Sequence, residues 1–351
     1  MLRILHTADW QIGRQYSRFE LEDAAALAEA RFKAIEKLAA LATEHHADLL
    51  VVAGDVFDSQ TLSDRNLRRS FNAMAGFTGP WLLLPGNHDA ALSESVWTRA
   101  RRLNCIPDYV HVLDTPELFL LDSLKLAVLP APLTQRQTYQ DLSDWFDQAE
   151  SPAGYWRLGL AHGSVSGLLE HLDSHNLIDQ NRVQRAKLDY LALGDWHGTL
   201  RIDARTWYAG TPEPDRAKDN DPGNALLIRF DRAGTEPAIE RVAIGRYRWH
   251  ALRREIHRSE DVAVLADDLR ALDRPLDRHV VELALEGVVD FATRAALTAA
   301  LEDLAARLCD LRVDEGRLAV LHSEDDLRQI PATGFIGSAL ARLREAAMGS
   351  D

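Results

Sequence analysis

Five short apolar segments of this chain are each followed by a side chain of the kind that binds metal ions, and this repetition constrains the fold more than any other feature. Apolar runs without polar alternation are typical of strands that are covered on both faces. Loops that leave the carboxyl ends of such strands form the ligand sites of layered α/β proteins. The sequence therefore predicts that these side chains meet at one edge. They are Asp9, Asp55, Asn87, His162 and His197.

The residue types in this set suit a pair of divalent metal ions. Two ions about 3.5–4 Å apart bind phosphate oxygens and supply a hydroxide for in-line attack. Mixed oxygen and nitrogen ligands with a bridging carboxylate hold such a pair, and Asp55 is the natural bridge. We expect Asp9 to bind one ion, Asn87 and His162 to bind the other, and His197 to complete the set. Any one of these residues alone would more often be a turn or helix cap, so the joint occurrence carries the prediction.

Neighbouring residues extend the predicted site. His88 is placed to protonate the leaving oxygen or to stabilise developing charge. Asp58 is expected to orient His88 and keep it protonated, or else to cap the following helix. Arg14 is the arginine nearest the first ligand loop and is a candidate for binding phosphate, with a solvated surface position as the alternative. Trp196 would stack on a base or pack as a wall of the site.

The motifs resemble those of the calcineurin-like metallophosphoesterase superfamily. D-x-Q at 9–11, GDVFD at 54–58, GNHD at 86–89, His162 in AHGS and GDWH at 194–197 follow its five motifs in order. The opening ILHTADWQIG, GDVFDS and YAGTPEP (208–214) resemble the SbcD-like branch of bacterial DNA-repair exonucleases. The resemblance implies an α/β fold, a four-layer αββα sandwich with a small C-terminal α/β cap domain.

The resemblance also implies an activity and partners. Nucleases of this branch use two divalent metal ions, typically Mn²⁺, with Fe, Mg²⁺ or Zn²⁺ as alternatives. They hydrolyse DNA phosphodiesters, form homodimers and work with a coiled-coil ATPase of the SMC type. The terminal helix would correspond to the segment that contacts this ATPase.

Two positions depart from the superfamily pattern. Gln11 stands where the pattern has histidine, and Asp195 stands where it has the first histidine of GH-x-H. Each is expected to bind metal through oxygen, although Gln11 has the alternative of an amide that touches no metal. More oxygen ligands favour harder ions such as Mn²⁺ over Zn²⁺. We expect metal binding to survive, with the ion on the Gln11 side held more loosely.

The apolar pattern divides the chain into three parts. Residues 1–245 would form the metallophosphoesterase domain, with helices at about 21–45 and 64–75 and antiparallel strands at 205–210, 225–231 and 238–245. Residues 246–323 would form a βαβαβ capping domain, with helices at 259–272 and 291–308 and a last strand at 317–322. Residues 324–351 would form an amphipathic tail helix.

Charge and cysteine content limit the function classes. The net charge of −14 weighs against a stand-alone, high-affinity DNA binder, but a nuclease subunit that draws DNA in through metals or a partner is compatible with it. The two cysteines define neither a disulfide framework nor a zinc cluster, so a cytoplasmic setting is expected, and no apolar run predicts a membrane span. Two alternatives to a DNA nuclease stay open: a cyclic-nucleotide phosphodiesterase, and a weakly active scaffold subunit of the ATPase.

Overall fold

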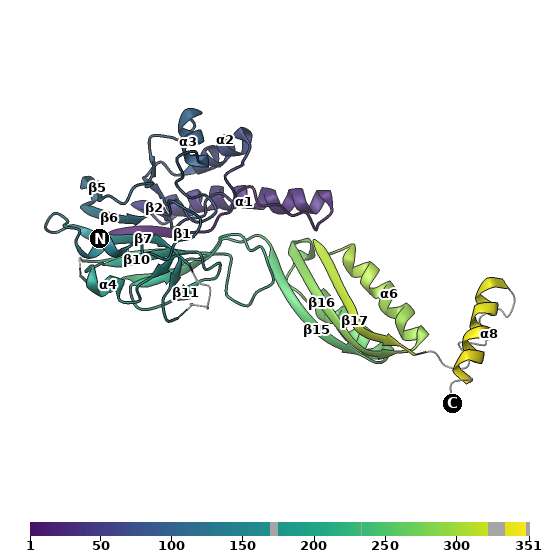
Figure 1. Ribbon diagram of the computed structural model, residues 1–351. Coiled ribbons are helices and arrows are strands. Elements are labelled where there is room, and N and C mark those ends of the chain that lie inside the picture. Colours follow the sequence, from purple (N-terminus) through teal and green to yellow (C-terminus); the bar gives the residue numbers. More distant parts are fainter. Residues whose placement is uncertain (169–174, 233, 322–333, 349–351) are drawn as a thin grey trace. The chain divides into compact units, whose positions relative to one another are not determined.

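A computed structural model describes residues 1–168, 175–232, 234–321 and 334–348. By internal contacts the chain divides into two compact units, Met1–Arg248 and Trp249–Asp351 (Figure 1). Each unit is described by itself below.

The first unit is built on two six-stranded sheets whose central strands are parallel. The first sheet has the order β14-β13-β1-β2-β3-β4, and the second has the order β11-β12-β10-β7-β6-β5. The strands of the first sheet are β1 (Leu2–Thr7), β2 (Leu49–Val52), β3 (Trp81–Leu83), β4 (Val110–Val112), β13 (Asn224–Phe230) and β14 (Ala238–Ala243). Those of the second are β5 (Phe119–Leu121), β6 (Leu126–Ala131), β7 (Trp156–His162), β10 (Tyr190–Gly194), β11 (Leu200–Arg201) and β12 (Thr206–Tyr208).

The two sheets pack face to face, and helices cover their outer faces. Strand β10 shows the arrangement: Tyr190 and Ala192 point into the core between the sheets, whereas Leu191 and Leu193 point to the outer layer. This alternation follows from the two-residue period of a strand. The unit is therefore the predicted αββα sandwich, and burial on both faces explains why its parallel strands are continuously apolar.

The helices of the outer layers pack through regularly spaced apolar side chains. On the first sheet, Phe32, Ile35 and Leu38 of α1 lie at helical spacing and are buried. The covering helices are α1 (Leu21–Glu44), α2 (Asp64–Ala73) and α3 (Val96–Arg102) on the first sheet, and η3 (Asp144–Asp147) and α4 (Arg182–Arg185) on the second. Short segments complete the unit: η1 (Met74–Gly76), η2 (Asp122–Leu124) and the paired strands β8 (Ser164–Val165) and β9 (Leu177–Ile178).

One strand orientation differs from the sequence prediction. Strands β13 and β14 are antiparallel as expected, but β12, which was predicted to be antiparallel, runs parallel to β10. Its antiparallel neighbour is the two-residue strand β11. A strand this short carries too few apolar residues to be recognised from sequence, so the hairpin that reverses the chain before β12 was missed.

Two glycines allow strand ends to approach closely, Gly194 between the two sheets and Gly86 within the first sheet. A Cβ added at Gly194, the last residue of β10, would collide with the carbonyl oxygen of Ala53 at the end of β2. A Cβ at Gly86 would collide with the backbone nitrogen and carboxylate of Asp55. The edge that carries the predicted ligands is therefore packed too closely for any larger residue at these positions.

The second unit has the predicted βαβαβ order. Its three strands, in the order β15-β16-β17, are β15 (Arg248–Ile256), β16 (His279–Val289) and β17 (Asp310–Val320). Its helices are α5 (Ser259–Arg270), η4 (Leu276–Arg278) and α6 (Phe291–Ala305). Val281 and Leu283 of β16 pack with Leu265 and Leu269 of α5 and Leu297 of α6 in one apolar core.

The boundaries of the last elements differ from the prediction. Strand β17 begins at Asp310 rather than at 317, because its first half alternates polar and apolar residues instead of forming an apolar run. The predicted tail begins outside the described residues, and its described part is α8 (Gly334–Met348). Within the described residues, no helix is both long enough and apolar enough to span a membrane.

Substitution of Gly194 tests the close approach of the sheets. We expect Gly194→Ala to lower the free energy of unfolding by about 1–3 kcal/mol, because the methyl group would be forced against Ala53. Urea unfolding followed by tryptophan fluorescence measures the change. Gly316→Ala is the control, since the atom nearest its added Cβ is the Asp314 side-chain oxygen at 3.2 Å. Equal stability of the Gly194 variant and the native chain would contradict the packing described.

Candidate metal centre

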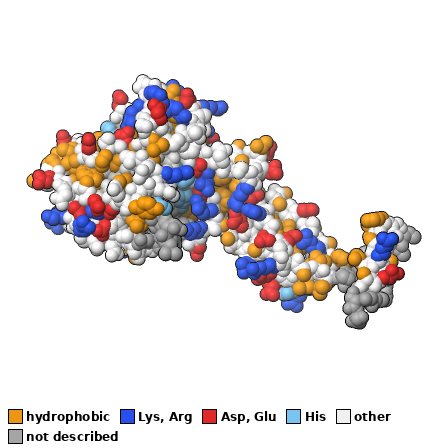
Figure 2. Space-filling view, viewed as in Figure 1, with side chains coloured by type: hydrophobic (Ala, Val, Ile, Leu, Met, Phe, Trp, Pro, Cys, Tyr) orange, Lys and Arg blue, Asp and Glu red, His pale blue; other side chains and the backbone are white. Residues whose placement is uncertain are grey.

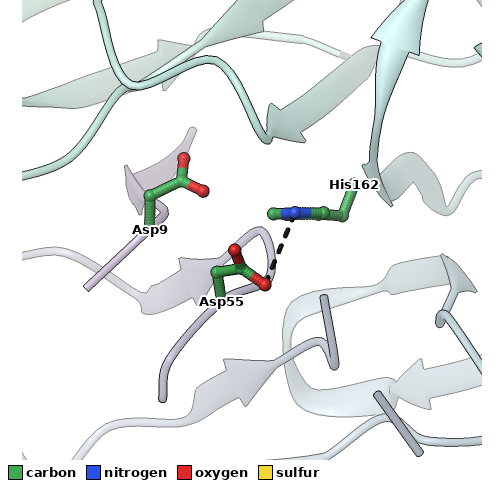
Figure 3. A group of neighbouring side chains, drawn as sticks. All are labelled: Asp9, Asp55 and His162. Carbon is green, nitrogen blue, oxygen red and sulfur yellow. Dashed lines mark ion pairs between the residues drawn. The ribbon is translucent and has the colours of Figure 1, made fainter. Parts of the chain in front are cut away.

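The carboxyl ends of strands from both sheets bring three predicted ligands together. Asp9 and Asp55 follow β1 and β2, and His162 ends β7. One donor atom from each lies within 4.8 Å of the others, and all three residues are buried (Figure 3). Asp55 Oδ1 lies 3.5 Å from His162 Nε2. Buried carboxylates this close to an imidazole form a donor set of the kind that binds divalent cations.

His162 and Asn87 present their lone pairs to this group. His162 Nδ1 lies 2.8 Å from the carbonyl oxygen of Ala53 and donates to it, so Nε2 is the nitrogen that the neutral ring would offer to a metal ion. Asn87 Oδ1 lies 2.9 Å from His162 Nε2, and this oxygen faces only acceptors, the Asp55 carboxylate among them. Either rotation of the amide or a cation among these atoms satisfies the contact. The residues therefore fit a divalent ion on the Asn87 side.

Several of these residues have strained backbones. The φ angles of Asp9, Gln11, Asp55 and Asp195 are 53°, 45°, 52° and 98°. Positive φ is uncommon for residues other than glycine and is concentrated at functional sites, where surrounding structure enforces it. In this chain it turns the side chains of four predicted ligands out of the strand direction and into the site.

Burial and charge shift the ionisation of the group. Burial raises the pKa of Asp9 to about 6, against the attraction of His197 and His162. Burial opposes protonation of His162, but the negative charges of Asp55, Asp9 and Asp195 raise its pKa to about 9. The site thus concentrates negative charge in a buried place, which a bound cation would offset.

Asp195 lies on the His162 side of the site. Its Oδ1 is 3.8 Å from His162 Nε2, and its Oδ2 accepts a hydrogen bond from Ser164 Oγ at 3.2 Å. Its backbone N–H donates to both carboxylate oxygens of Asp9, at 3.2 Å each. Asp195 therefore contacts His162 through its side chain and Asp9 through its backbone.

Gln11 and His197 lie on the other side and interact with each other. Gln11 Nε2 is 3.2 Å from His197 Nε2, and Gln11 Oε1 accepts a hydrogen bond from Arg14 Nη1 at 2.8 Å. His197 Nδ1 lies 3.4 Å from Asp215 Oδ2. Arg14, which the sequence suggested as a phosphate ligand, is directed instead to residues of the site itself, Gln11, Asp58 and Asp215.

His88 is oriented by the backbone of Asp58. His88 Nδ1 lies 2.9 Å from the Asp58 carbonyl oxygen, whereas the Asp58 carboxylate is 4.0 Å away. His88 Nε2 faces the site, 3.9 Å from Asp55 Oδ2. Asp58 therefore contacts His88, and its main-chain oxygen makes a shorter contact than the carboxylate that the sequence analysis had in view.

Two acidic residues were missed by the sequence analysis. Asp89 is buried and accepts hydrogen bonds from the backbone N–H groups of Gly86, at 2.7 Å, and Phe57, at 3.1 Å. Burial and the nearby charge of Asp55 raise its pKa to about 8. Asp215 is also buried; burial opposes its ionisation, but hydrogen bonds from His197 and Arg216 hold its pKa well below its usual range. Asp89 ends the GNHD motif, a signal that could have identified it, whereas the distant partners of Asp215 leave no local signal.

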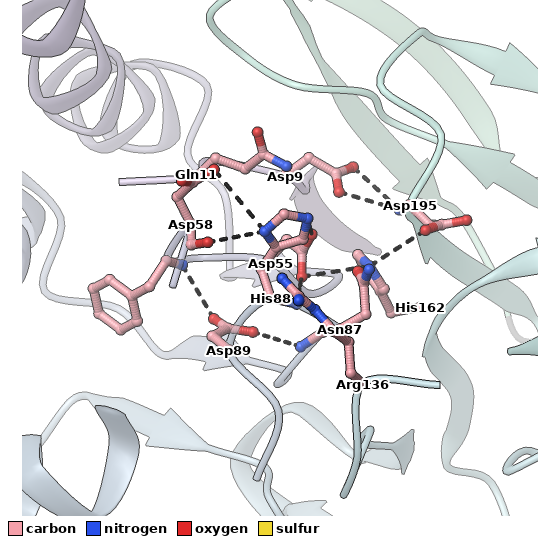
Figure 4. A network of polar contacts seen from close by, with 12 residues as sticks. Asp9, Gln11, Asp55, Asp58, Asn87, His88, Asp89, Arg136, His162 and Asp195 are labelled. Atoms are coloured by element: carbon pink, nitrogen blue, oxygen red, sulfur yellow. Dashed lines mark hydrogen bonds and ion pairs between the residues drawn. The ribbon is translucent and has the colours of Figure 1, made fainter. Parts of the chain in front are cut away.

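Two tryptophans adjacent in sequence to candidate ligands, Trp10 and Trp196, and one exposed arginine, Arg136, have distinct environments. Trp10 is 1% exposed and packs in the core, so it does not stack on a ligand. Trp196 is half-buried, and Lys218 Nζ lies 4.2 Å from its ring centre. Figure 4 draws the exposed Arg136 beside Asn87. Within the described part of the chain, the Arg136 guanidinium has no carboxylate partner.

Residues 2–219 match the model of the calcineurin-like phosphoesterase family. The chain belongs to this family, in agreement with the αββα sandwich and the ligand types at its strand ends.

Named relatives include DNA-repair proteins and a small-molecule enzyme. The DNA double-strand break repair protein Mre11 of Aeropyrum pernix is 28% identical over 70% of this chain and 62% of its own length. The SbcD component of the nuclease SbcCD of Rhodobacter capsulatus is 39% identical over 26% of this chain and 22% of its own length. The 3′,5′-cyclic adenosine monophosphate phosphodiesterase CpdA of Escherichia coli is 27% identical over 46% of this chain and 58% of its own length. The match spans less than two thirds of each relative. The crystal structure of TT1561 of Thermus thermophilus gives a TM-score of 0.43 at 15% identity over 69% of this chain and 99% of that one.

Asp89 should be needed to hold the loop that carries Asn87 and His88. We expect Asp89→Asn to lower the free energy of unfolding by about 1–3 kcal/mol, because one amide oxygen cannot replace a carboxylate that accepts from two backbone N–H groups. Mn²⁺ affinity should fall with it, as measured by isothermal titration calorimetry. The exposed Asp108→Asn is the matched control. Unchanged stability and affinity in both variants would rule out this role for Asp89.

Proposed function

We infer that this chain is a metal-dependent phosphodiester hydrolase that acts on DNA, as a nuclease subunit in repair. The observation that carries this proposal is the convergence of Asp9, Asp55 and His162 from two sheets, with donor atoms within 4.8 Å of one another. Family membership supports the reaction class, and the Mre11 and SbcCD relatives support the substrate.

The ligands divide between two positions for divalent ions, for which we propose Mn²⁺. Asp55 would be shared by both positions, Asn87, His162 and Asp195 would hold the ion on one side, and Asp9, Gln11 and His197 would serve the other. Bound divalent ions supply Lewis acidity and a nucleophile from water. Mainly oxygen donors with imidazole favour Mn²⁺ over softer ions.

His88 supplies the proton for the leaving oxygen. The contact of Nδ1 with the Asp58 carbonyl fixes the ring, so that Nε2 is directed toward the site. A fixed donor near the scissile bond contributes about 10²–10⁴-fold to such reactions. Asp58 acts as a positioning residue through its main chain.

Arg136 is the side chain that we propose for binding the substrate phosphate. It is exposed beside Asn87 and is drawn toward the site in Figure 4. Arg14 is already paired with Asp58 and Asp215. Trp196 remains a candidate for stacking on a base, with Lys218 over its ring adding positive charge for a phosphate.

The second candidate function is hydrolysis of a cyclic nucleotide. The CpdA relative, whose match covers 46% of this chain, favours it. The second unit and α8 favour the DNA substrate instead, because a small phosphodiester needs neither a cap nor a partner helix. Because the net charge is −14, and acidic and basic side chains are interspersed on the face seen in Figure 2, DNA would be drawn in by the metals or by a partner.

The partner we propose is a coiled-coil ATPase of the SMC type, and α8 is its contact. Phe335, Ile336 and Leu343 of this helix are exposed. Exposed apolar side chains on one helix are typical of a segment that docks on another helix. We further propose that the chain forms a homodimer and that the second unit caps the DNA side of the site.

Substitution of Asp55, the proposed bridging carboxylate, and of His88, the proposed proton donor, should separate metal binding from proton donation. We expect Asp55→Ala to abolish Mn²⁺-dependent release of nucleotides from linear DNA, because both ion positions lose a ligand. His88→Gln should reduce the rate by about 10²–10⁴-fold while Mn²⁺ affinity stays near that of the native chain. A nuclease assay and calorimetry on the same preparations measure the two effects. Exposed Asp108→Asn is the control.

The same assay separates the candidate substrates. Linear DNA, 3′,5′-cyclic AMP and bis(p-nitrophenyl) phosphate are compared with Mn²⁺ and after its removal by EDTA. Hydrolysis of the small esters alone would replace the nuclease proposal by the second candidate. A chain that hydrolyses none of the three, and whose Asp55→Ala variant supports repair in cells, would be a scaffold.

A further inference from the structure

The two halves of the metal centre are not equally ready to bind an ion. On the Asn87 side, the Asn87 oxygen and His162 Nε2 lie 2.9 Å apart, with oxygens of Asp55 and Asp195 at 3.5 and 3.8 Å from the same nitrogen. Ser164 donates to the far oxygen of Asp195 and leaves the near one free. Three side-chain oxygens thus surround His162 Nε2, and with the neutral ring these atoms offer four donors to one cation.

On the other side, the donor atoms of Gln11 and His197 are already occupied. Gln11 Oε1, the atom that would bind metal, accepts from Arg14 Nη1 at 2.8 Å. This contact fixes the amide, so the Gln11 amide nitrogen faces His197 Nε2 at 3.2 Å and donates to it. The lone pair of His197 that would bind metal is therefore used by Gln11.

Asp215 closes these contacts into a ring. His197 Nδ1 lies 3.4 Å from Asp215 Oδ2, and Arg14 Nη1 lies 3.2 Å from the same oxygen. The Asp215 side chain is only 1% exposed and is also contacted by Arg31 and Arg216. A buried anion held by several cations is costly to displace, so the ring has a fixed anchor.

We propose that this chain holds one divalent ion tightly, among Asp55, Asn87, His162 and Asp195, and that the ring of Arg14, Gln11, His197 and Asp215 closes the second position. The proposal rests on the metal-dependent hydrolase proposed above and deepens it. A second ion enters only by breaking the ring, and on Gln11 Oε1 it would lie beside the Arg14 guanidinium, whose charge repels it.

Gln11 is the residue that makes the ring possible. Its amide both accepts from Arg14 and donates to His197. A neutral histidine at this position could offer a ring nitrogen to metal, but it has no carbonyl oxygen to accept from Arg14. The departure of Gln11 from the family pattern therefore changes the number of ions held, whereas Asp195 replaces one ligand by another.

Metal stoichiometry of the full chain tests this proposal without reference to activity. The metal-free protein is titrated with Mn²⁺ in a calorimeter, and bound Mn²⁺ is counted by elemental analysis after dialysis. We expect one tight ion per native chain and a second that binds about 10–100-fold more weakly. Electron paramagnetic resonance of the native chain at one equivalent should show isolated Mn²⁺.

Gln11→His should bind two ions of similar affinity and give the spectrum of a spin-coupled pair. Arg14→Gln is the second variant: it frees the Gln11 oxygen and should strengthen binding of the second ion. Arg65→Gln, an exposed arginine outside the ring, is the matched control and should bind like the native chain. Two equally tight ions in the native chain, or no gain in either ring variant, would overturn the proposal.

The metal stoichiometry can be interpreted independently of the nuclease assay. One tight ion in the native chain and two in Gln11→His, without hydrolysis of DNA, would leave the asymmetry standing and reject the proposed substrate. Two ions bound with equal affinity by the native chain, together with hydrolysis of DNA, would reject the asymmetry and leave the proposed substrate standing.

Discussion

The hydrogen bond from His162 Nδ1 to the carbonyl oxygen of Ala53 ties together the two sheets at the edge that carries the metal centre. Ala53 follows β2 in the first sheet, and His162 ends β7 in the second. The bond fixes which nitrogen of His162 is protonated, and it requires the close approach that Gly194 permits. The site contacts that cross between the sheets, such as those of His162 with Asp55 and of Asp195 with Asp9, depend on these strand ends meeting.

The candidate ligand residues could be predicted from the sequence because they follow a local pattern, whereas the αββα sandwich was expected from the resemblance of the motifs to a known superfamily. Continuous apolar strands identify a sheet with two covered faces, and Asp9, Asp55 and His162 each occupy the end of such a strand. The grouping of the ligands followed from topology, since parallel strands place their carboxyl ends at the same edge.

What the sequence could not predict depends on partners that are distant along the chain. Asp215 contacts His197, Arg14 and Arg31, which come from three separate segments, and no spacing marks that association. The same limit applies to Arg14: proximity in sequence to Asp9 suggested phosphate binding, whereas its actual partners include Asp215. The loose binding expected on the Gln11 side was argued from ligand strength alone, and the ring gives it a different physical basis.

The first sheet has a consequence for how the protein is made. Its central strand β1 pairs with β13, at residues 224–230, so the sheet that holds Asp9 is incomplete until most of the first unit has been synthesised. Three further candidate ligands, His162, Asp195 and His197, lie at or just beyond strand ends of the second sheet, which is formed by the intervening chain. An incomplete chain on the ribosome therefore carries some of the candidate ligand residues but not the assembled site. Such an order of assembly leaves a growing chain without the complete site until both sheets of the first unit have formed.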